Sequence, residues 1–154
     1  MANATIFDRL KQDHDQHRLL LDKISDAKNE EERREKLFEQ FRVEVTAHAA
    51  AEEETLYATM LARPDLREDA QHSVSEHKEI DDFLETLGEL KFAGEAWERE
   101  FAKMKKRYLH HIDEEEEEMF PDAAAELTGK EEKALADRFA ERKPDELERA
   151  EQAG

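Results

Sequence analysis

The stretch His48-Ala49-Ala50-Ala51-Glu52-Glu53-Glu54-Thr55-Leu56-Tyr57 decides the fold of this chain, because a second stretch repeats its pattern. The second stretch lies 63 residues further along and reads His111-Ile112-Asp113-Glu114-Glu115-Glu116-Glu117-Glu118-Met119-Phe120. In each stretch a histidine is followed four residues later by a glutamate. Residues four apart share one face of an α-helix. Both stretches are therefore predicted to be helical, with an imidazole and a carboxylate on the same face.

The same offset relates much of the remaining chain. His14 falls on His77, and apolar positions such as Leu21 and Leu84 also coincide. Apolar residues recur at steps of three and four, which is typical of one helical face, in four segments separated by short joints. These segments span roughly residues 4–27, 30–62, 66–90 and 95–120. The sequence thus predicts an all-α, antiparallel up-down-up-down four-helix bundle, built from one helical hairpin used twice.

A C-terminal segment lies beyond the repeated part of the chain. Gly129 and Pro144 interrupt this segment, and a short extra helix is expected over about residues 130–142. We therefore expect residues 1–125 to form the bundle. Residues 126–154 would form a helical tail that packs on the bundle or trails from it.

Composition narrows the possible partners. The chain has 154 residues, a formal net charge of −18 and no cysteine. Such an acidic protein is repelled by nucleic acid and by anionic membrane surfaces, and it attracts cations. The lack of cysteine excludes disulfides and thiolate metal sites. Because no segment has the apolar length of a membrane span and the N-terminus does not resemble a signal peptide, a cytoplasmic protein is expected.

Six polar residues lie on the apolar stripes of the four predicted helices. They are His14, His48, Glu52, His77, His111 and Glu115. A single histidine on such a stripe is usually an ordinary core residue satisfied by hydrogen bonds. Two inward carboxylates without a cation would each cost several kcal/mol of desolvation, on the order expected for buried charges. Imidazole and carboxylate ligands suit iron, zinc and manganese, and carboxylates that can bridge favour a dinuclear metal site.

The remaining histidines fit such a site less well. His17 lies on the first stripe, but its counterpart in the repeat is Ile80, so a core or supporting position is expected. His72 lies five residues before His77, about 140° around an ideal helix. It is a possible seventh ligand only if a local π-bulge turns it inward. His110 is expected to point away from the site.

The motifs resemble those of the hemerythrin-like, His-His-Glu cation-binding domains of bacteria. The matching segments are Leu10-Lys11-Gln12-Asp13-His14, the two stretches quoted above with Pro121 following the second, and Glu76-His77-Lys78-Glu79-Ile80. They span about residues 5–125. The resemblance implies an antiparallel four-helix bundle that holds two non-haem iron ions. An oxo or hydroxo group and two carboxylates, here Glu52 and Glu115, would bridge these ions.

One position departs from the family's oxygen carriers. Those proteins use five histidines, two of them four residues apart on the third helix, whereas the residue four before His77 is Ser73. This departure leaves either a four-histidine site or a site completed by His72, Tyr57 or water.

The function expected from this resemblance is a di-iron protein that binds or senses dioxygen or a related small diatomic or peroxide ligand. The alternatives are a di-iron enzyme that decomposes peroxide or reduces nitric oxide, and a protein for iron storage or donation. A ferritin-like di-iron site is disfavoured, because no histidine has a glutamate three residues before it. A zinc hydrolase is also disfavoured, since its usual site needs only three protein ligands.

Overall fold

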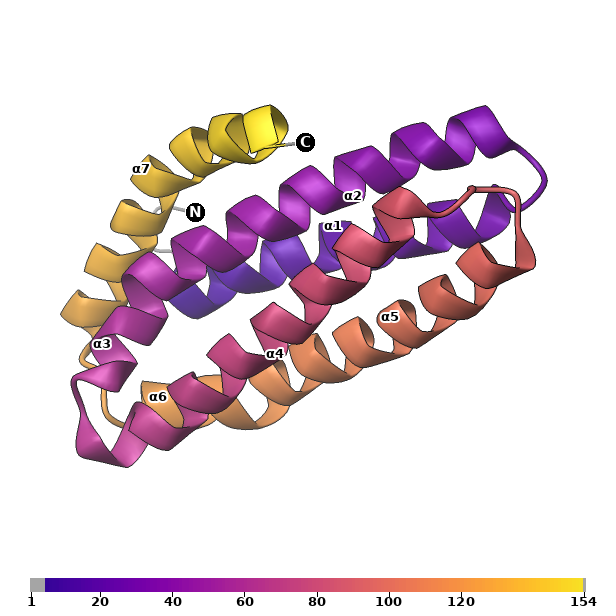
Figure 1. Cartoon of the computed structure of the whole chain (residues 1–154). Coiled ribbons are helices and arrows are strands. Elements are labelled where there is room, and N and C mark those ends of the chain that lie inside the picture. The colour runs from indigo at the N-terminus through magenta and orange to yellow at the C-terminus, as the bar shows by residue number, and fades with distance from the viewer. Residues whose placement is uncertain (1–4, 154) are drawn as a thin grey trace.

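The computed structural model describes residues 5–153 as a helical bundle (Figure 1). The helices that form the bundle run up, down, up and down: α1 (Ile6–Asp26), α2 (Glu31–Glu52), α4 (Pro64–Glu89) and α5 (Glu95–Glu114). The π-helical segments η1 (Glu53–Tyr57) and η2 (Glu115–Met119) extend α2 and α5 into α3 (Ala58–Leu61) and α6 (Phe120–Ala124). No strand occurs between residues 5 and 153, and the predicted all-α antiparallel bundle is confirmed. Within that range no helix is long and apolar enough to cross a membrane.

Local sequence signals set several helix boundaries. Thr5 accepts a hydrogen bond from the Asp8 amide while the Asp8 carboxylate accepts one from the Thr5 amide, which forms a capping box at the start of α1. Pro64 occupies the first turn of α4, where its missing N–H costs nothing. Gly94 is the N-cap of α5. These positions explain why the joints predicted from Pro64 and Gly94 are where the chain turns.

The C-terminal helix corrects one prediction. A short helix was expected over about residues 130–142, but α7 (Gly129–Ala153) is 25 residues long and passes through Pro144. A proline inside a helix costs about 3 kcal/mol, because it removes a hydrogen bond and crowds the preceding turn. Glu146 and Ala150, beyond the proline, are buried. The packing of the second half of α7 therefore outweighs the helix-breaking tendency of the proline.

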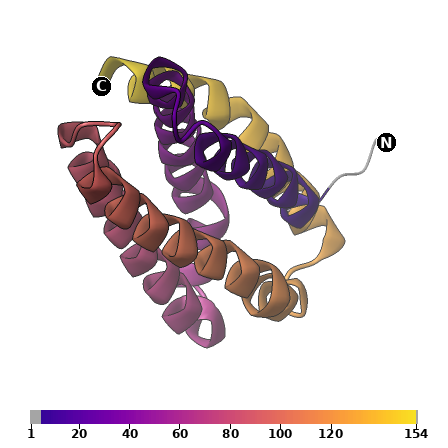
Figure 2. The same ribbon diagram turned by 90° about the vertical axis from the view of Figure 1, so that its right-hand side faces the viewer.

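α7 packs mainly against one half of the bundle. It contacts α1 and α2, and Figure 2 shows it lying outside this pair. Phe139 is fully buried among apolar residues that include Ile6 and Leu10 of α1. The Arg9 guanidinium lies 4.9 Å from the centre of the Phe139 ring. The tail is thus part of the folded body and covers the α1–α2 hairpin.

Phe139→Ala is expected to lower the free energy of unfolding by about 3–5 kcal/mol, because it leaves a cavity where a fully buried ring stood. Chemical denaturation followed by circular dichroism would measure the loss. Leu19→Ala is the control, since the Leu19 side chain is 52% exposed. A loss for Phe139→Ala as small as that of the control would mean that α7 adds little to stability.

Two apolar clusters leave a polar layer between them. The first gathers residues at the α3, α6 and α7 end of the bundle, including Leu10, Leu56 and Phe120. The second occupies the end nearer the α1–α2 joint, including Leu20, Phe41 and Trp97. On α1, His14 and His17 fall between these clusters and are fully buried. The polar side chains of this layer are therefore shielded from water on both sides.

Candidate metal centre

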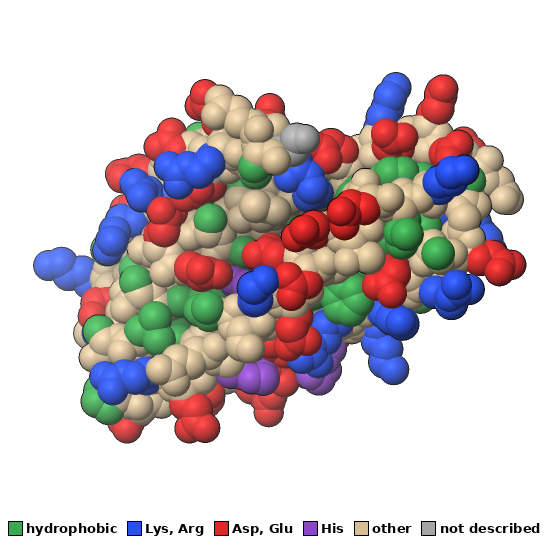
Figure 3. All heavy atoms as spheres, viewed as in Figure 1, with side chains coloured by type: hydrophobic (Ala, Val, Ile, Leu, Met, Phe, Trp, Pro, Cys, Tyr) green, Lys and Arg blue, Asp and Glu red, His purple; other side chains and the backbone are tan. Residues whose placement is uncertain are grey.

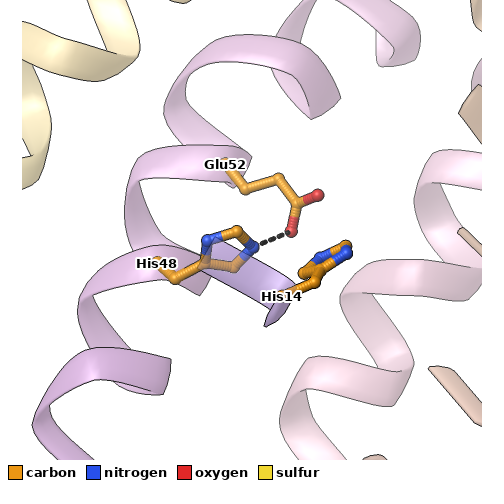
Figure 4. A group of neighbouring side chains, drawn as sticks. All are labelled: His14, His48 and Glu52. Atoms are coloured by element: carbon orange, nitrogen blue, oxygen red, sulfur yellow. Dashed lines mark ion pairs between the residues drawn. The ribbon is translucent and has the colours of Figure 1, made fainter. Parts of the chain in front are cut away.

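The six predicted ligand residues meet in this polar layer. They come from α1, α2, α4, α5 and the start of η2, and each is at most 6% exposed. Five of them, all but Glu115, have nitrogen and oxygen atoms that form two groups, each within 4.8 Å, and Glu52 belongs to both. The groups are His14, His48 and Glu52, and Glu52, His77 and His111. Figure 4 shows the first group, in which the His14 and His48 rings and the Glu52 carboxylate converge from α1 and α2.

Each central carboxylate lies between imidazoles of the two hairpins. Glu52 Oε1 is 3.6 Å from His48 Nε2 and 3.4 Å from His77 Nε2. Glu115 Oε1 is 3.2 Å from His14 Nε2 and 3.6 Å from His111 Nε2. The inner nitrogen of every histidine is therefore Nε2, and both carboxylates are placed where they could contact two metal ions.

A second carboxylate contacts the outer nitrogen of each histidine. His48 Nδ1 lies 2.8 Å from Asp13 Oδ2, and His111 Nδ1 lies 2.7 Å from Glu76 Oε1. The other two contacts cross between the hairpins, where His14 Nδ1 meets Glu116 and His77 Nδ1 meets Glu53, both at 2.7 Å. When Nδ1–H donates to a carboxylate, the Nε2 lone pair is left for a metal.

Sequence reasoning missed Asp13 and Glu76, although a signal was present. Both precede a ligand histidine directly, and they occupy equivalent positions in the 63-residue repeat. Glu53 and Glu116 form the other equivalent pair. The repeat could therefore have revealed the supporting carboxylates as well as the inner residues.

The two π-helical segments begin at the central glutamates. η1 follows Glu52 directly, and η2 starts at Glu115. A π-helical turn holds an extra residue, and such turns are frequent at functional sites. Here Glu52 and Glu115 still point inward, while the neighbouring Glu53 and Glu116 reach the outer nitrogens of histidines from the other hairpin.

Burial and charge shift the pKa values of the central groups. Burial, together with the nearby Glu115 charge, raises the pKa of Glu52 well above its usual value. Burial would also raise the pKa of Glu115, but the imidazoles of His111 and His14 outweigh it and hold that pKa well below its usual value. Burial opposes protonation of His14, yet Glu115 and Glu116 raise its pKa to about 9. In the absence of a cation, protons are therefore retained on Glu52 and His14 and offset part of the negative charge of the centre.

Several buried atoms at the centre have no hydrogen-bond partner in the described structure. They are His14 Nε2, His48 Nε2, both carboxylate oxygens of Glu52, and Glu115 Oε1. A buried polar atom without a partner costs about 1–3 kcal/mol, more when charged. Two imidazoles with one carboxylate, as in each group, is the donor set of non-haem iron sites with open positions. The residues present therefore fit a pair of metal ions.

The two halves differ beside the centre. The Tyr57 hydroxyl donates a hydrogen bond to Glu115 Oε2 and lies 3.5 Å from His77 Nε2. Phe120, its counterpart in the repeat, stacks on His14 with ring centres 6.0 Å apart. Burial and the carboxylates of Glu115 and Glu52 raise the pKa of Tyr57 well above its usual value, so the phenol keeps its proton.

A second difference involves His17, which was expected to be a core or supporting residue. Its Nδ1 lies 2.6 Å from the Tyr108 hydroxyl, and its buried Nε2 has no partner in the described structure. The His17 ring centre is 5.1 Å from that of His48. The corresponding positions of the other half hold Ile80 and Val45, which cannot form such a pair. His17 and Tyr108 thus add a polar pair beside the His14–His48 group alone.

The structure does not bring His72 into the centre. Its side chain is 56% exposed, and Nε2 lies near Glu114 and Glu76 instead. The π-bulge that would have turned it inward is absent from α4, which is α-helical from Pro64 to Glu89. His110 is exposed as well and contacts Glu114.

Asp13→Asn is expected to weaken metal binding by about 10- to 100-fold, the usual effect of losing a carboxylate behind a ligand histidine. Asp13 Oδ2 also accepts a hydrogen bond from the buried Lys143 at 2.9 Å, which fixes the carboxylate in front of His48. Competition with a chelator would measure the affinity. Asp15→Asn is the control, because Asp15 is exposed and lies away from His48. Equal affinities for the two variants would contradict the supporting role of Asp13.

Comparisons with known proteins agree with this geometry. A crystal structure of a hemerythrin HHE cation-binding domain-containing protein, the Rv2633c homolog from Mycobacterium kansasii, is similar with a TM-score of 0.82. The two proteins are 26% identical, and the alignment covers 97% of this chain and 90% of that chain. No curated protein sequence matches significantly. The model of the hemerythrin HHE cation-binding domain matches residues 5–123, and the chain therefore belongs to this family.

Proposed function

We propose that the centre holds two iron ions and that the protein binds or senses dioxygen or a related small molecule there. The observation that carries the proposal is the convergence of unpartnered buried nitrogen and oxygen atoms from both hairpins. His14 and His48 would hold one ion, and His77 and His111 the other. Glu52 and Glu115 would bridge them, because each lies between imidazoles of the two halves.

The chain's own residues would prepare the site for a small ligand. Ferrous ions at such a site would supply an open coordination position and electrons. The four outer carboxylates orient the imidazoles, so that little rearrangement is needed on binding. The apolar clusters on both sides exclude bulk water. A centre of this kind favours small, weakly polar ligands over bulky or charged ones.

A peroxide-decomposing enzyme is the second candidate, and Tyr57 favours it. The Tyr57 phenol is buried, protonated and close to both Glu115 and His77. Cleavage of an O–O bond needs a proton for the departing oxygen, and a phenol positioned at the centre can hold and move that proton. His17 beside the His14–His48 group stays neutral, because burial and the neighbouring His48 lower its pKa well below the usual value, and its Nδ1 lies within hydrogen-bond distance of the Tyr108 hydroxyl.

Anaerobic iron loading followed by optical titration separates these functions. Metal analysis should give about two irons per chain, and dioxygen should then produce a spectral change that reverses when the gas is removed. Sustained release of oxygen from added peroxide would instead identify the enzyme, and Tyr57→Phe should then slow turnover without lowering the iron content. One metal ion per chain, or zinc alone after growth with ample iron, would contradict the proposal.

A further inference from the structure

A separate pocket opens on the surface between α4 and the η2–α6 segment. Its volume is about 150 Å³. Its lining includes Asp69, Glu118 and Asp122, and none of the described residues that line it is a lysine or arginine. A concave surface lined by charges of one sign concentrates the opposite ions and raises their rate of arrival. The pocket is therefore suited to cations.

A mixed set of ligands lies at the side of this pocket. His72 Nε2 is 3.0 Å from Glu114 Oε1 and 3.4 Å from Glu76 Oε2, and the three ligand atoms lie within 4.8 Å. Imidazole with carboxylates suits divalent transition metals, unlike an acidic surface alone. In Figure 3, histidine side chains emerge among acidic ones along the lower edge of the molecule. The exposed histidines of the described chain are His72 and His110.

The pocket and the metal centre share a wall. Glu115 lines the pocket, is 1% exposed, and carries the unpartnered Oε1 that lies 3.2 Å from His14 Nε2. Glu76 belongs to the His72 group and also holds His111 through its other oxygen, at 2.7 Å. A cation in the pocket would therefore be separated from the centre by a ligand of the centre itself.

The internal repeat shows that this pocket is not a by-product of the fold. At the equivalent place in the other half, the residues that match Asp69, His72, Glu114 and Glu118 are Ile6, Arg9, Ala51 and Thr55. Ile6 and Ala51 belong to the apolar cluster there, and α7 covers that face with Phe139 against Arg9. The acidic and imidazole groups are thus confined to the half that α7 leaves open.

One further feature agrees with a cation in the pocket. Burial and a side-chain hydrogen bond with Asp122 raise the pKa of Asp69, so two carboxyl groups lie side by side there.

We propose that this pocket is a second divalent-cation site and the route by which iron reaches the centre. His72, Glu114 and Glu76 bind the cation after the outer carboxylates have attracted it, and Glu115 receives it at the inner wall. The delivery step rests on the proposed di-iron centre, whereas cation binding in the pocket does not.

Cobalt binding tests the site itself. Equilibrium dialysis of the full chain against Co²⁺ should resolve a class of tight binding sites at the centre and a class of weaker binding sites in the pocket. His72→Ala, and Asp69→Asn with Asp122→Asn, should weaken the second class by about tenfold or more. These residues are exposed or half-exposed, so the fold should be retained. Glu32→Gln with Glu95→Gln removes the same charge as the Asp69–Asp122 pair from exposed positions elsewhere and should leave both classes intact.

The rate of iron uptake tests delivery. Apoprotein is mixed anaerobically with Fe²⁺, and the iron still accessible to a ferrous chelator is followed with time. The pocket variants should take up iron about tenfold or more slowly than wild type and reach the same final content. Uptake at the wild-type rate, or weak Co²⁺ binding that does not depend on His72, would overturn the proposal. If the wild-type chain showed the His72-dependent class of Co²⁺ sites but no tight class, the result would contradict the di-iron centre and support the pocket as a cation site.

Discussion

Glu52→Gln and Glu115→Gln should each lower metal affinity by more than about 100-fold, beyond the usual effect of losing a supporting residue. Each glutamine keeps the shape of the side chain but removes a negative charge that would offset two cations. Each central carboxylate also lies between imidazoles of both hairpins, so its loss affects both metal positions at once. Metal analysis after gel filtration and the absorbance of an oxo bridge would both report the loss.

Glu117→Gln is the matched control, because Glu117 lies in the same acidic run and is exposed. It should retain the wild-type iron content. Glu53→Gln and Glu116→Gln should fall between these extremes, since both residues contact the outer nitrogen of a histidine. If Glu53→Gln and Glu116→Gln released more iron than the central pair, the assignment of the bridging residues would be wrong by one position in both helices.

The bundle and the convergence of the six residues could be predicted because both depend on helical periodicity. A histidine and glutamate four apart, such as His48 and Glu52, must share a face on any regular helix. The 63-residue repeat then placed a second such pair opposite the first. Neither argument needs knowledge of tertiary contacts, so the sequence was sufficient.

Other features depend on contacts between distant segments. The π-helical turns at Glu53 and Glu115 were not predicted, because neither segment contains a glycine or proline that would mark an irregularity in the helix. The length of α7 was underestimated because Pro144 signals a helix end locally, whereas the ion pair of Lys143 with Asp13 and the burial of Ala150 stabilise the continuous helix. His72 was offered as a ligand on the assumption of a bulge in α4, but the bulges lie in the extensions of α2 and α5.

The differences between the two helical hairpins could be predicted only in part from the sequence. The repeat showed that His17 matches Ile80 and that Tyr57 matches Phe120. It did not show that Tyr57 would contact Glu115 or that His17 would pair with Tyr108, since both contacts join residues far apart in the chain. These differences, together with α7 on one side and the acidic pocket on the other, make the surroundings of the two His–His–Glu groups chemically unequal.

The metal-free Glu52→Gln variant should gain stability relative to metal-free wild type as the pH rises above about 4.5. The pKa of Glu52 is raised in the folded state from its ordinary value of 4.5, first by burial and then by the charge of Glu115. Between the unfolded and folded pKa values of Glu52 the folded state holds more of a proton on this carboxyl group than the unfolded state, so this group destabilises wild type as the pH rises, and the glutamine does not. For one such group the free energy of unfolding changes by at most about 1.4 kcal/mol per pH unit.

Urea denaturation of chelator-treated wild type and Glu52→Gln at several pH values would measure this pH dependence. The variant should become the more stable protein as the pH rises, although it binds metal worse, because a buried carboxylate without a cation has been replaced by a neutral amide. Parallel stability curves from pH 4.5 to 7 would show that the central carboxylate is not held in its protonated form in the metal-free protein.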